Sequence, residues 1–147
     1  MMRRIKTAAL ACLFALGMGA AFAHDEAGEK PRLATGDKIR IVAFQPSGTV
    51  KRGVETEFTI EIEAELHSAK EGIARVWFNL RSPTSYRMVE RRDLREGRQR
   101  VTFAVTVTPV DWADRGPFTV LVNMGPKATE ADWTPTTFAQ KTISVKP

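Results

Sequence analysis

A tryptophan and two charged residues lie together in a polar segment near the carboxyl end of the chain. This segment, residues 125–135, carries Lys127, Asp132 and Trp133 among small and polar residues. An indole ring in a loop can stack on a sugar or anchor a protein partner, and neighbouring charges can orient a polar ligand. The alternative is that Trp133 folds back as a lid over the end of the core. The exposure of Trp133 separates these two hypotheses.

Basic residues are dense in residues 90–100. The guanidinium groups that can bind a protein partner or an anionic envelope polymer belong to Arg92, Arg95 and Arg98. The alternative is charge pairing between antiparallel strands, in which Arg98 and Arg100 come near Glu63 and Glu65. Exposed pairs of this kind contribute little to stability, so the second interpretation makes the run an ordinary solvated surface.

The two histidines offer a metal site. If a leader is removed after Ala23, His24 becomes the first residue, and its α-amino nitrogen and imidazole can chelate Cu(II). His67 can supply a further ligand, since the twelve residues 25–36 can span a gap at up to ~3.3–3.6 Å each. The arrangement is similar to the histidine-brace sites of lytic polysaccharide monooxygenases and some periplasmic copper carriers. Copper binding is therefore an alternative hypothesis.

The sequence offers no recognisable nucleophile and base for hydrolytic catalysis. The single cysteine, Cys12, lies in an apolar stretch near the amino terminus, and no Gly-x-Ser-x-Gly element occurs. Phosphate-cradling loops of the Walker or dinucleotide type are absent from the sequence as well. We therefore predict no catalytic residues and no enzymatic activity.

The first 23 residues have the pattern of a secretory signal peptide. Arg3, Arg4 and Lys6 precede the almost wholly apolar residues 7–22, and Ala21-Phe22-Ala23 supplies a small-residue cleavage site. A lipoprotein interpretation, with cleavage before Cys12, leaves a shorter apolar core and an imperfect lipobox. The pattern predicts a periplasmic or secreted protein.

The net charge of the chain is lower without this leader. Nineteen Lys and Arg then face 17 Asp and Glu, a net charge of +2 in place of +5. A bulk balance of +2 does not indicate nucleic-acid binding. No segment after the leader approaches the ~20 apolar residues that span a bilayer, so we expect no transmembrane segment there.

Alternation of apolar and polar residues predicts an all-β domain over residues 37–147, after a flexible polar tail at 24–36. The seven expected strands are 38–44, 57–66, 73–80, 86–90, 100–108, 118–124 and 138–145. Seven short antiparallel strands without a long helix are typical of a two-sheet β-sandwich. The alternation places Trp77 on the opposite face of its strand from Val76 and Phe78.

One short motif resembles a known family. The run Asp114-Arg115-Gly116-Pro117-Phe118-Thr119-Val120 is similar to the Asp-x-Gly-x-aromatic corner that precedes strand F in immunoglobulin-like domains. The chain thus resembles a bacterial immunoglobulin-like or fibronectin type III-like domain. The resemblance implies a seven-stranded antiparallel immunoglobulin-like β-sandwich, a fold that hosts adhesion, carbohydrate binding, assembly and spacer roles alike.

Strands that run alternately down and up bring three connections to one end of such a sandwich. These connections are residues 67–72, 92–98 and 125–135, which we call the loop pole. Loops held by a rigid scaffold carry most recognition in sandwiches of this kind. We therefore predict a non-catalytic binding or interaction module that acts through the loop pole; a structural spacer or assembly subunit is the remaining alternative.

Overall fold

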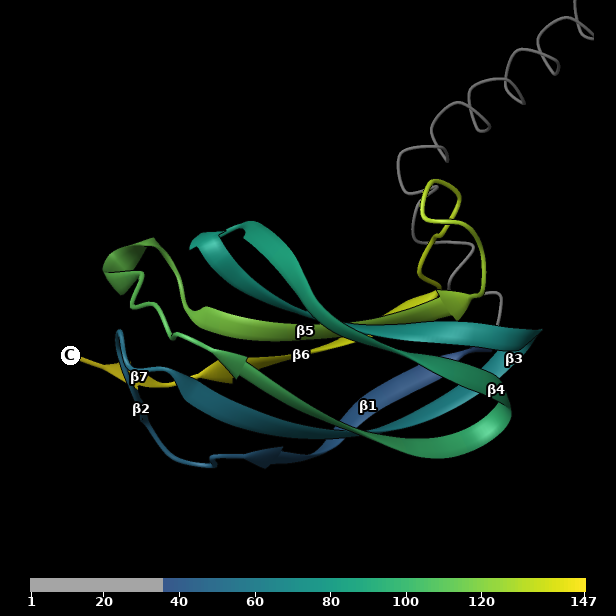
Figure 1. The fold of residues 1–147 in the computed structure, drawn as a ribbon, viewed down its shortest axis with the longest axis horizontal. Helices are drawn as coiled ribbons and strands as arrows, with labels where there is room; N and C mark the ends of the chain where they lie inside the picture. Colours follow the sequence, from purple (N-terminus) through teal and green to yellow (C-terminus); the bar gives the residue numbers. More distant parts are fainter. Residues whose placement is uncertain (1–35) are drawn as a thin grey trace, which may run out of the picture.

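The computed structural model describes residues 36–147, which form one curled antiparallel sheet and a small parallel pair (Figure 1). The strands of the large sheet are β1 Lys38–Gln45, β3 Thr56–Ser82, β4 Ser85–Val107, β5 Phe118–Pro126 and β6 Thr137–Ile143. The short strands β2 Val50–Lys51 and β7 Val145–Lys146 pair in parallel, and a 3-10 turn spans Ala113–Arg115. The expected leader at 1–23 and all but Gly36 of the expected tail lie outside the described residues.

Two strands are much longer than the sequence predicts. Residues 67–72 and 92–98 were expected to be loops, but they lie inside β3 and β4, so that part of the strand prediction is wrong. The β3–β4 ladder is interrupted between the pairs Leu66↔Gly97 and Glu71↔Arg95, where four residues of β3 oppose one of β4. A bulge bends strands without ending them, and the polar residues of a bend have the composition of a loop.

The bend folds β3 back over its own buried face. Residues 59–65 of β3 pair with β1, and residues 56–66 pair with residues 97–107 of β4. In the second half, residues 72–78 pair with β5, and residues 71–78 pair with residues 87–95 of β4. The rings of Phe58 and Phe78, which lie on the two halves of the same strand, have centroids 5.5 Å apart. The core therefore fills the concave side of the curled sheet, and the predicted all-β antiparallel class is confirmed.

Alternation of residue types builds this core from both halves. Its fully buried side chains include Phe58, Ile60, Ile62, Leu66, Val76, Phe78, Phe103, Val120, Val122 and Met124. Each of these strands presents every second residue to the concave side, as period-two alternation requires. Trp77 lies on the other face of β3, as predicted; it is half-buried, and its Nε1 donates to Asn123 Oδ1 at 2.9 Å.

A buried asparagine holds the corner before β5. Asn79 is 0% exposed, and its Nδ2 donates to the carbonyls of Pro83 and Pro117 at 3.0 and 2.9 Å. Its Oδ1 accepts from the backbone N–H of Thr119 at 2.9 Å. The chain passes this corner through Gly116, whose φ of 141° favours glycine. The Asn79 side chain thus supplies the hydrogen bonds of this corner, because Phe118 has no hydroxyl group that could form one.

The helical element of the described residues is the 3-10 turn at Ala113–Arg115. Within 36–147 no helix has the length and apolar character needed to cross a membrane.

Candidate functional site

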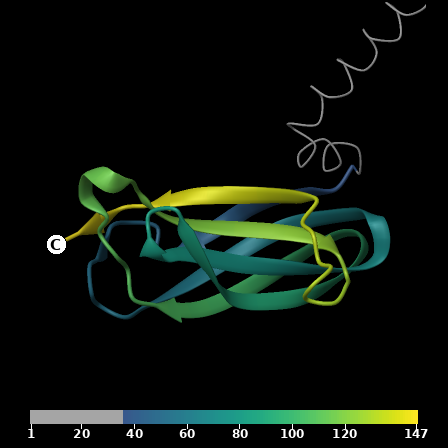
Figure 2. The same cartoon turned by 90° about the horizontal axis from the view of Figure 1, so that it is seen from above.

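The three segments of the loop pole meet at one end of the molecule, opposite the carboxyl terminus (Figure 1 and Figure 2). The backbone N–H of Lys127 donates to the carbonyl of Glu71 at 2.9 Å, which ties residues 125–135 to the bend of β3. The Lys127 Nζ also lies 3.6 Å from Glu71 and 3.9 Å from Asp93 on β4. The expected juxtaposition is therefore present, with strand bends in place of two of the three loops.

A buried arginine lies beneath this pole. The side chain of Arg75 on β3 is only 6% exposed, and its Nη2 donates to Glu130 Oε1 at 3.0 Å. The same oxygen accepts from Arg91 Nη1 at 2.9 Å. Antiparallel pairing places Arg91 of β4 directly opposite Arg75, so two neighbouring strands present two guanidinium groups to one loop carboxylate.

Trp133 covers Arg75. The Arg75 guanidinium carbon lies 4.0 Å from the centroid of the indole ring, a cation–π stack, and Trp133 is half-buried. Among the described residues, the Nε of Arg75 and the Nε1 of Trp133 are both buried without a hydrogen-bond partner. Trp133 does fold back, as one of the two hypotheses expects, but onto the outer face of β3, because Arg75 alternates with the core residues Ala74 and Val76.

A second buried polar group joins the pole to the amino-terminal end of β1. Asp37 accepts hydrogen bonds from the backbone N–H groups of His67 and Ser68 at 2.7 and 2.9 Å. It also accepts from Ser68 Oγ and from Thr136 Oγ1, each at 2.6 Å. Burial by itself raises the pKa of this carboxyl, but the four hydrogen bonds outweigh it and hold the pKa below the ordinary value of 3.8.

The other residues predicted in the 125–135 segment and in β4 have structural partners. Asp132 accepts from Thr129 Oγ1 at 3.1 Å and so stabilises the turn of its own loop. Arg92 donates to the carbonyl of Thr102 at 3.0 Å and lies 5.4 Å from the Phe103 ring, so it links the two halves of the bent β4. Neither side chain is placed with Trp133 in the Arg75 cluster.

Arg95 and Arg98 also lie away from that cluster. The backbone N–H of Arg95 donates to Gln99 Oε1 at 3.1 Å, and Arg95 is exposed. Arg98 donates to Glu65 Oε2 at 2.8 Å on the outer face of the first half of β3. Of the six predicted binding residues, the structure thus places Trp133 and Lys127 at the junction of the three segments.

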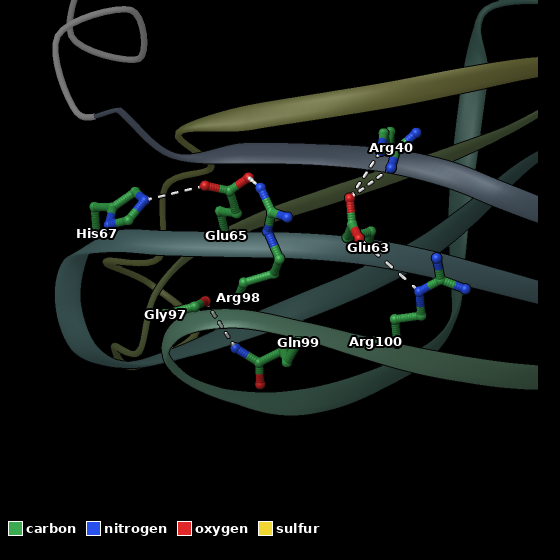
Figure 3. A network of polar contacts seen from close by, with 8 residues as sticks. All are labelled: Arg40, Glu63, Glu65, His67, Gly97, Arg98, Gln99 and Arg100. Atoms are coloured by element: carbon green, nitrogen blue, oxygen red, sulfur yellow. Dashed lines mark hydrogen bonds and ion pairs between the residues drawn. The ribbon is translucent and has the colours of Figure 1, made fainter.

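Figure 3 shows the charge ladder to which Arg98 belongs, formed by Arg40, Glu63, Glu65, His67, Arg98 and Arg100. Register pairs Glu63 with Arg100 and Glu65 with Arg98, so the cross-strand charge pairing expected for these two arginines is present. Arg40 also donates to Glu63, at 2.7 Å. Hydrogen bonds from Arg40 to Glu63 and from Arg98 to Glu65 lower the pKa of both carboxyls, and Glu65 raises the pKa of Arg98.

The proposed copper ligands are only partly described. The side chain of His67 is 51% exposed, and its Nε2 lies 3.4 Å from Glu65 Oε1. In the described part of the chain no group of three or more His, Cys, Asp or Glu side chains is placed to hold a metal ion. His24 lies outside the described residues.

Two central residues of the cluster, Arg75 and Glu130, are not among the predicted binding residues, whereas Arg91 belongs to the basic run at 90–100. The sequence does single out Arg75, because it is the one charged residue in the predicted strand 73–80. Its partner Glu130 is 55 positions away in the sequence, and no local pattern connects the two. Only the return of residues 125–135 over the outer face of β3 brings them together.

Comparison with known proteins gives distant structural likenesses only. No protein-family model matches the chain, and no curated protein matches it. A crystal structure of a beta-glucosidase from Kluyveromyces marxianus in complex with glucose is similar over 75% of this chain, with 14% sequence identity and a TM-score of 0.35. The chain spans 14% of that enzyme's length.

Proposed function

We propose that this protein is an exported, non-catalytic binding module that acts through the loop pole. The observation that carries this proposal is the cluster of Arg75, Arg91, Glu130 and Trp133. Arginine and tryptophan are the residue types that dominate binding energy in protein recognition. Here two arginines stand on paired strands, which hold them rigidly, and the tryptophan comes from a loop that can adapt to a ligand.

The fold that we propose for this module is a variant of the immunoglobulin-like or fibronectin type III-like β-sandwich. The two halves of β3 support it, because each half pairs with its own set of strands and the two sets face each other across Phe58 and Phe78. In this variant the second and third strands expected from the sequence join into β3, and the fourth and fifth join into β4. The bends then take the place of two loops of the pole.

Backbone amide NMR of the purified protein tests the binding proposal. The probes are a glutamate-rich decapeptide, its glutamine counterpart, trigalacturonic acid and chitotriose. We expect at least one probe to shift amides in residues 73–77, 89–93 and 125–135, and Trp133→Ala to abolish the shift. Val54→Ala is the matched control, since Val54 is a 47% exposed apolar residue outside the pole. Shifts confined to other surfaces, or none with any probe, would contradict the proposal.

Copper binding by His24 and His67 stays an alternative proposal. One observation favours it: the bond from the His67 N–H to Asp37 places the start of the described chain beside His67, with residues 25–36 left to reach back. Cu(II) titration followed by electron paramagnetic resonance tests it. Nitrogen hyperfine lines that vanish in His67→Ala, and in a form with one residue added before His24, would support a copper site. Equal behaviour of all forms would exclude it and leave the binding module or the spacer role.

A further inference from the structure

Around Arg75, two positively charged guanidinium groups share one carboxylate. Arg75 and Arg91 both donate to a single oxygen of Glu130, Oε1, at 3.0 and 2.9 Å. Arg75 is buried, with 6% of its side chain exposed, whereas the side chain of Glu130 is 66% exposed. A buried charge needs close pairing to offset its lost hydration, and here one shared, solvent-facing carboxylate supplies that pairing.

The unsatisfied atoms of the cluster are all donors. The Nε of Arg75 and the Nε1 of Trp133 are buried without partners among the described residues. Guanidinium and indole N–H groups have no acceptor capacity, so only a ligand that accepts hydrogen bonds can complete them. A carboxylate has two acceptor oxygens and pairs with arginine in a planar fork. The site is therefore shaped for a carboxylate that makes more hydrogen bonds than Glu130 makes.

Glu130 can leave this site without unfolding its loop. The turn that carries it is closed by the backbone N–H groups of Asp132 and Trp133, which both donate to the carbonyl of Thr129. The Lys127 N–H holds the start of the loop to β3 independently. None of these three bonds involves the Glu130 side chain. A carboxylate from another molecule can therefore take the place of the Glu130 carboxylate between the two arginines.

An extended peptide fits the surroundings of the site. In residues 36–147 the strand β4 pairs with β3 only, so it is an edge strand of the sheet. Beside the site the backbone N–H groups of Arg91 and Arg95 donate to the Glu90 and Gln99 side chains, so a peptide here is recognised mainly by side chains. The same stretch of this strand carries four exposed arginines, Arg87, Arg91, Arg92 and Arg95, of which Arg91 belongs to the cluster. The acidic residues of the same stretch are already engaged, since Asp93 lies 3.9 Å from Lys127 and Glu90 accepts from the N–H of Arg91. This basic edge complements an acidic segment.

We propose that the loop pole binds an acidic peptide segment, one carboxylate of which replaces Glu130 between Arg75 and Arg91 while the segment lies along the edge of β4. This inference rests on the proposed function and names the ligand class of that site. Glu130 competes with the ligand, so removing its charge strengthens binding. Removing a guanidinium group that receives the carboxylate weakens binding.

Fluorescence anisotropy with a labelled glutamate-rich decapeptide tests the competition. We expect Glu130→Gln to bind the peptide about tenfold more tightly than the native protein, which corresponds to about 1.4 kcal/mol. Arg91→Gln should bind it about tenfold more weakly. The control is Glu57→Gln, which removes the same charge at an exposed position outside the pole and should leave the affinity unchanged. The glutamine decapeptide should bind none of these forms.

The outcomes separate this inference from the proposed function. Equal affinity of Glu130→Gln and the native protein, or equal binding of the two peptides, would overturn the competition. If trigalacturonic acid binds with the same response to Glu130→Gln while the peptide does not bind, the ligand is an acidic saccharide and the peptide is ruled out. If only the glutamine peptide or chitotriose shifts amides of the pole, the carboxylate site fails and the binding module stands. If no probe shifts them, both proposals fail.

Discussion

Two clusters of arginine and glutamate on the outer surface of the sheet have nearly the same composition and very different environments. In the charge ladder the side chains of Arg40, Arg98 and Arg100 are 58–68% exposed, and each pairs across strands with Glu63 or Glu65. In the cluster at the loop pole, Arg75 is 6% exposed and lies under Trp133. The ladder follows from strand register alone, whereas the pole cluster requires a loop to return over the sheet.

The density of charged residues in the sequence does not by itself locate the buried site of this protein. The dense arginine run from 91 to 100 attracts attention in the sequence, but its later members pair with glutamates on exposed strands, where ion pairs contribute little. The isolated Arg75 occupies the site with buried, unsatisfied donors. The burial of Arg75 distinguishes the pole cluster from the exposed charge ladder.

Replacing Arg75 should have the largest effect on stability. Arg75→Ala removes the side chain on which Trp133 packs and leaves a cavity between the sheet and the loop, so we expect the free energy of unfolding to fall by about 2–3 kcal/mol. Urea unfolding measures this change. Arg98→Ala is the matched control, because Arg98 also pairs with a glutamate but is exposed. Equal losses in the two variants would show that burial does not separate the clusters.

Asp37 should give the pole an acid sensitivity of its own. Its pKa is lower in the folded protein, so the unfolded chain binds the proton more tightly. The stability that ionised Asp37 contributes is therefore complete above the ordinary carboxyl pKa of 3.8 and is lost as the pH falls through the lower folded value.

Asp37→Asn should reduce the free energy of unfolding by about 1–2 kcal/mol at pH 7 and by less below pH 4, since the carboxylate accepts charge-assisted hydrogen bonds. Urea titrations between pH 3 and pH 7 measure the dependence. The control is Asp114→Asn, at an exposed aspartate in the 3-10 turn. A loss that is independent of pH would show that the ionised form of Asp37 is not what stabilises the pole.

Neutralising Glu130 should have a smaller effect on the free protein. Glu130→Gln keeps a hydrogen-bond acceptor beside Arg75 but removes its charge, so we expect a loss of about 1 kcal/mol. Hydrogen exchange of the amides in residues 128–131 should accelerate at the same time, because this part of the loop loses its contact with Arg75 and Arg91, whereas the bonded amides of Lys127, Asp132 and Trp133 should change less. Unchanged exchange in this segment would mean that Glu130 does not hold the loop.

Changes in the ladder should be the smallest of all. Glu63→Gln and Arg98→Ala should leave the urea midpoint at 0.15 M salt within experimental error, because these side chains form solvated pairs. The lowered pKa of Glu63 depends on guanidinium groups, so its contribution at low salt should decline as salt screens them. The hydrogen bonds that Asp37 accepts from His67 N–H, Ser68 and Thr136 come from uncharged groups, so their contribution should respond much less to salt. Equal salt dependence of the two carboxyls would remove this part of the contrast.

Much of the fold could be predicted because period-two alternation is a local property. It identified the strand at 118–124, and it placed Trp77 on the face of β3 opposite Val76 and Phe78. It failed at residues 67–72 and 92–98, where a bulge keeps two strands paired through polar residues that resemble loops. Whether a polar stretch ends a strand or bends it depends on its partner strand, which a local pattern does not contain.

Local patterns of residue type predict the all-β class, the alternation that builds the core and, where the two strands pair antiparallel, the proximity of Arg98 and Arg100 to Glu65 and Glu63. These follow from the spacing of residue types along a strand and from antiparallel register. The tertiary structure decided that β3 folds back on itself and that Glu130 reaches Arg75 across 55 positions. It also decided which arginine is buried, because burial depends on what the rest of the chain places above a residue.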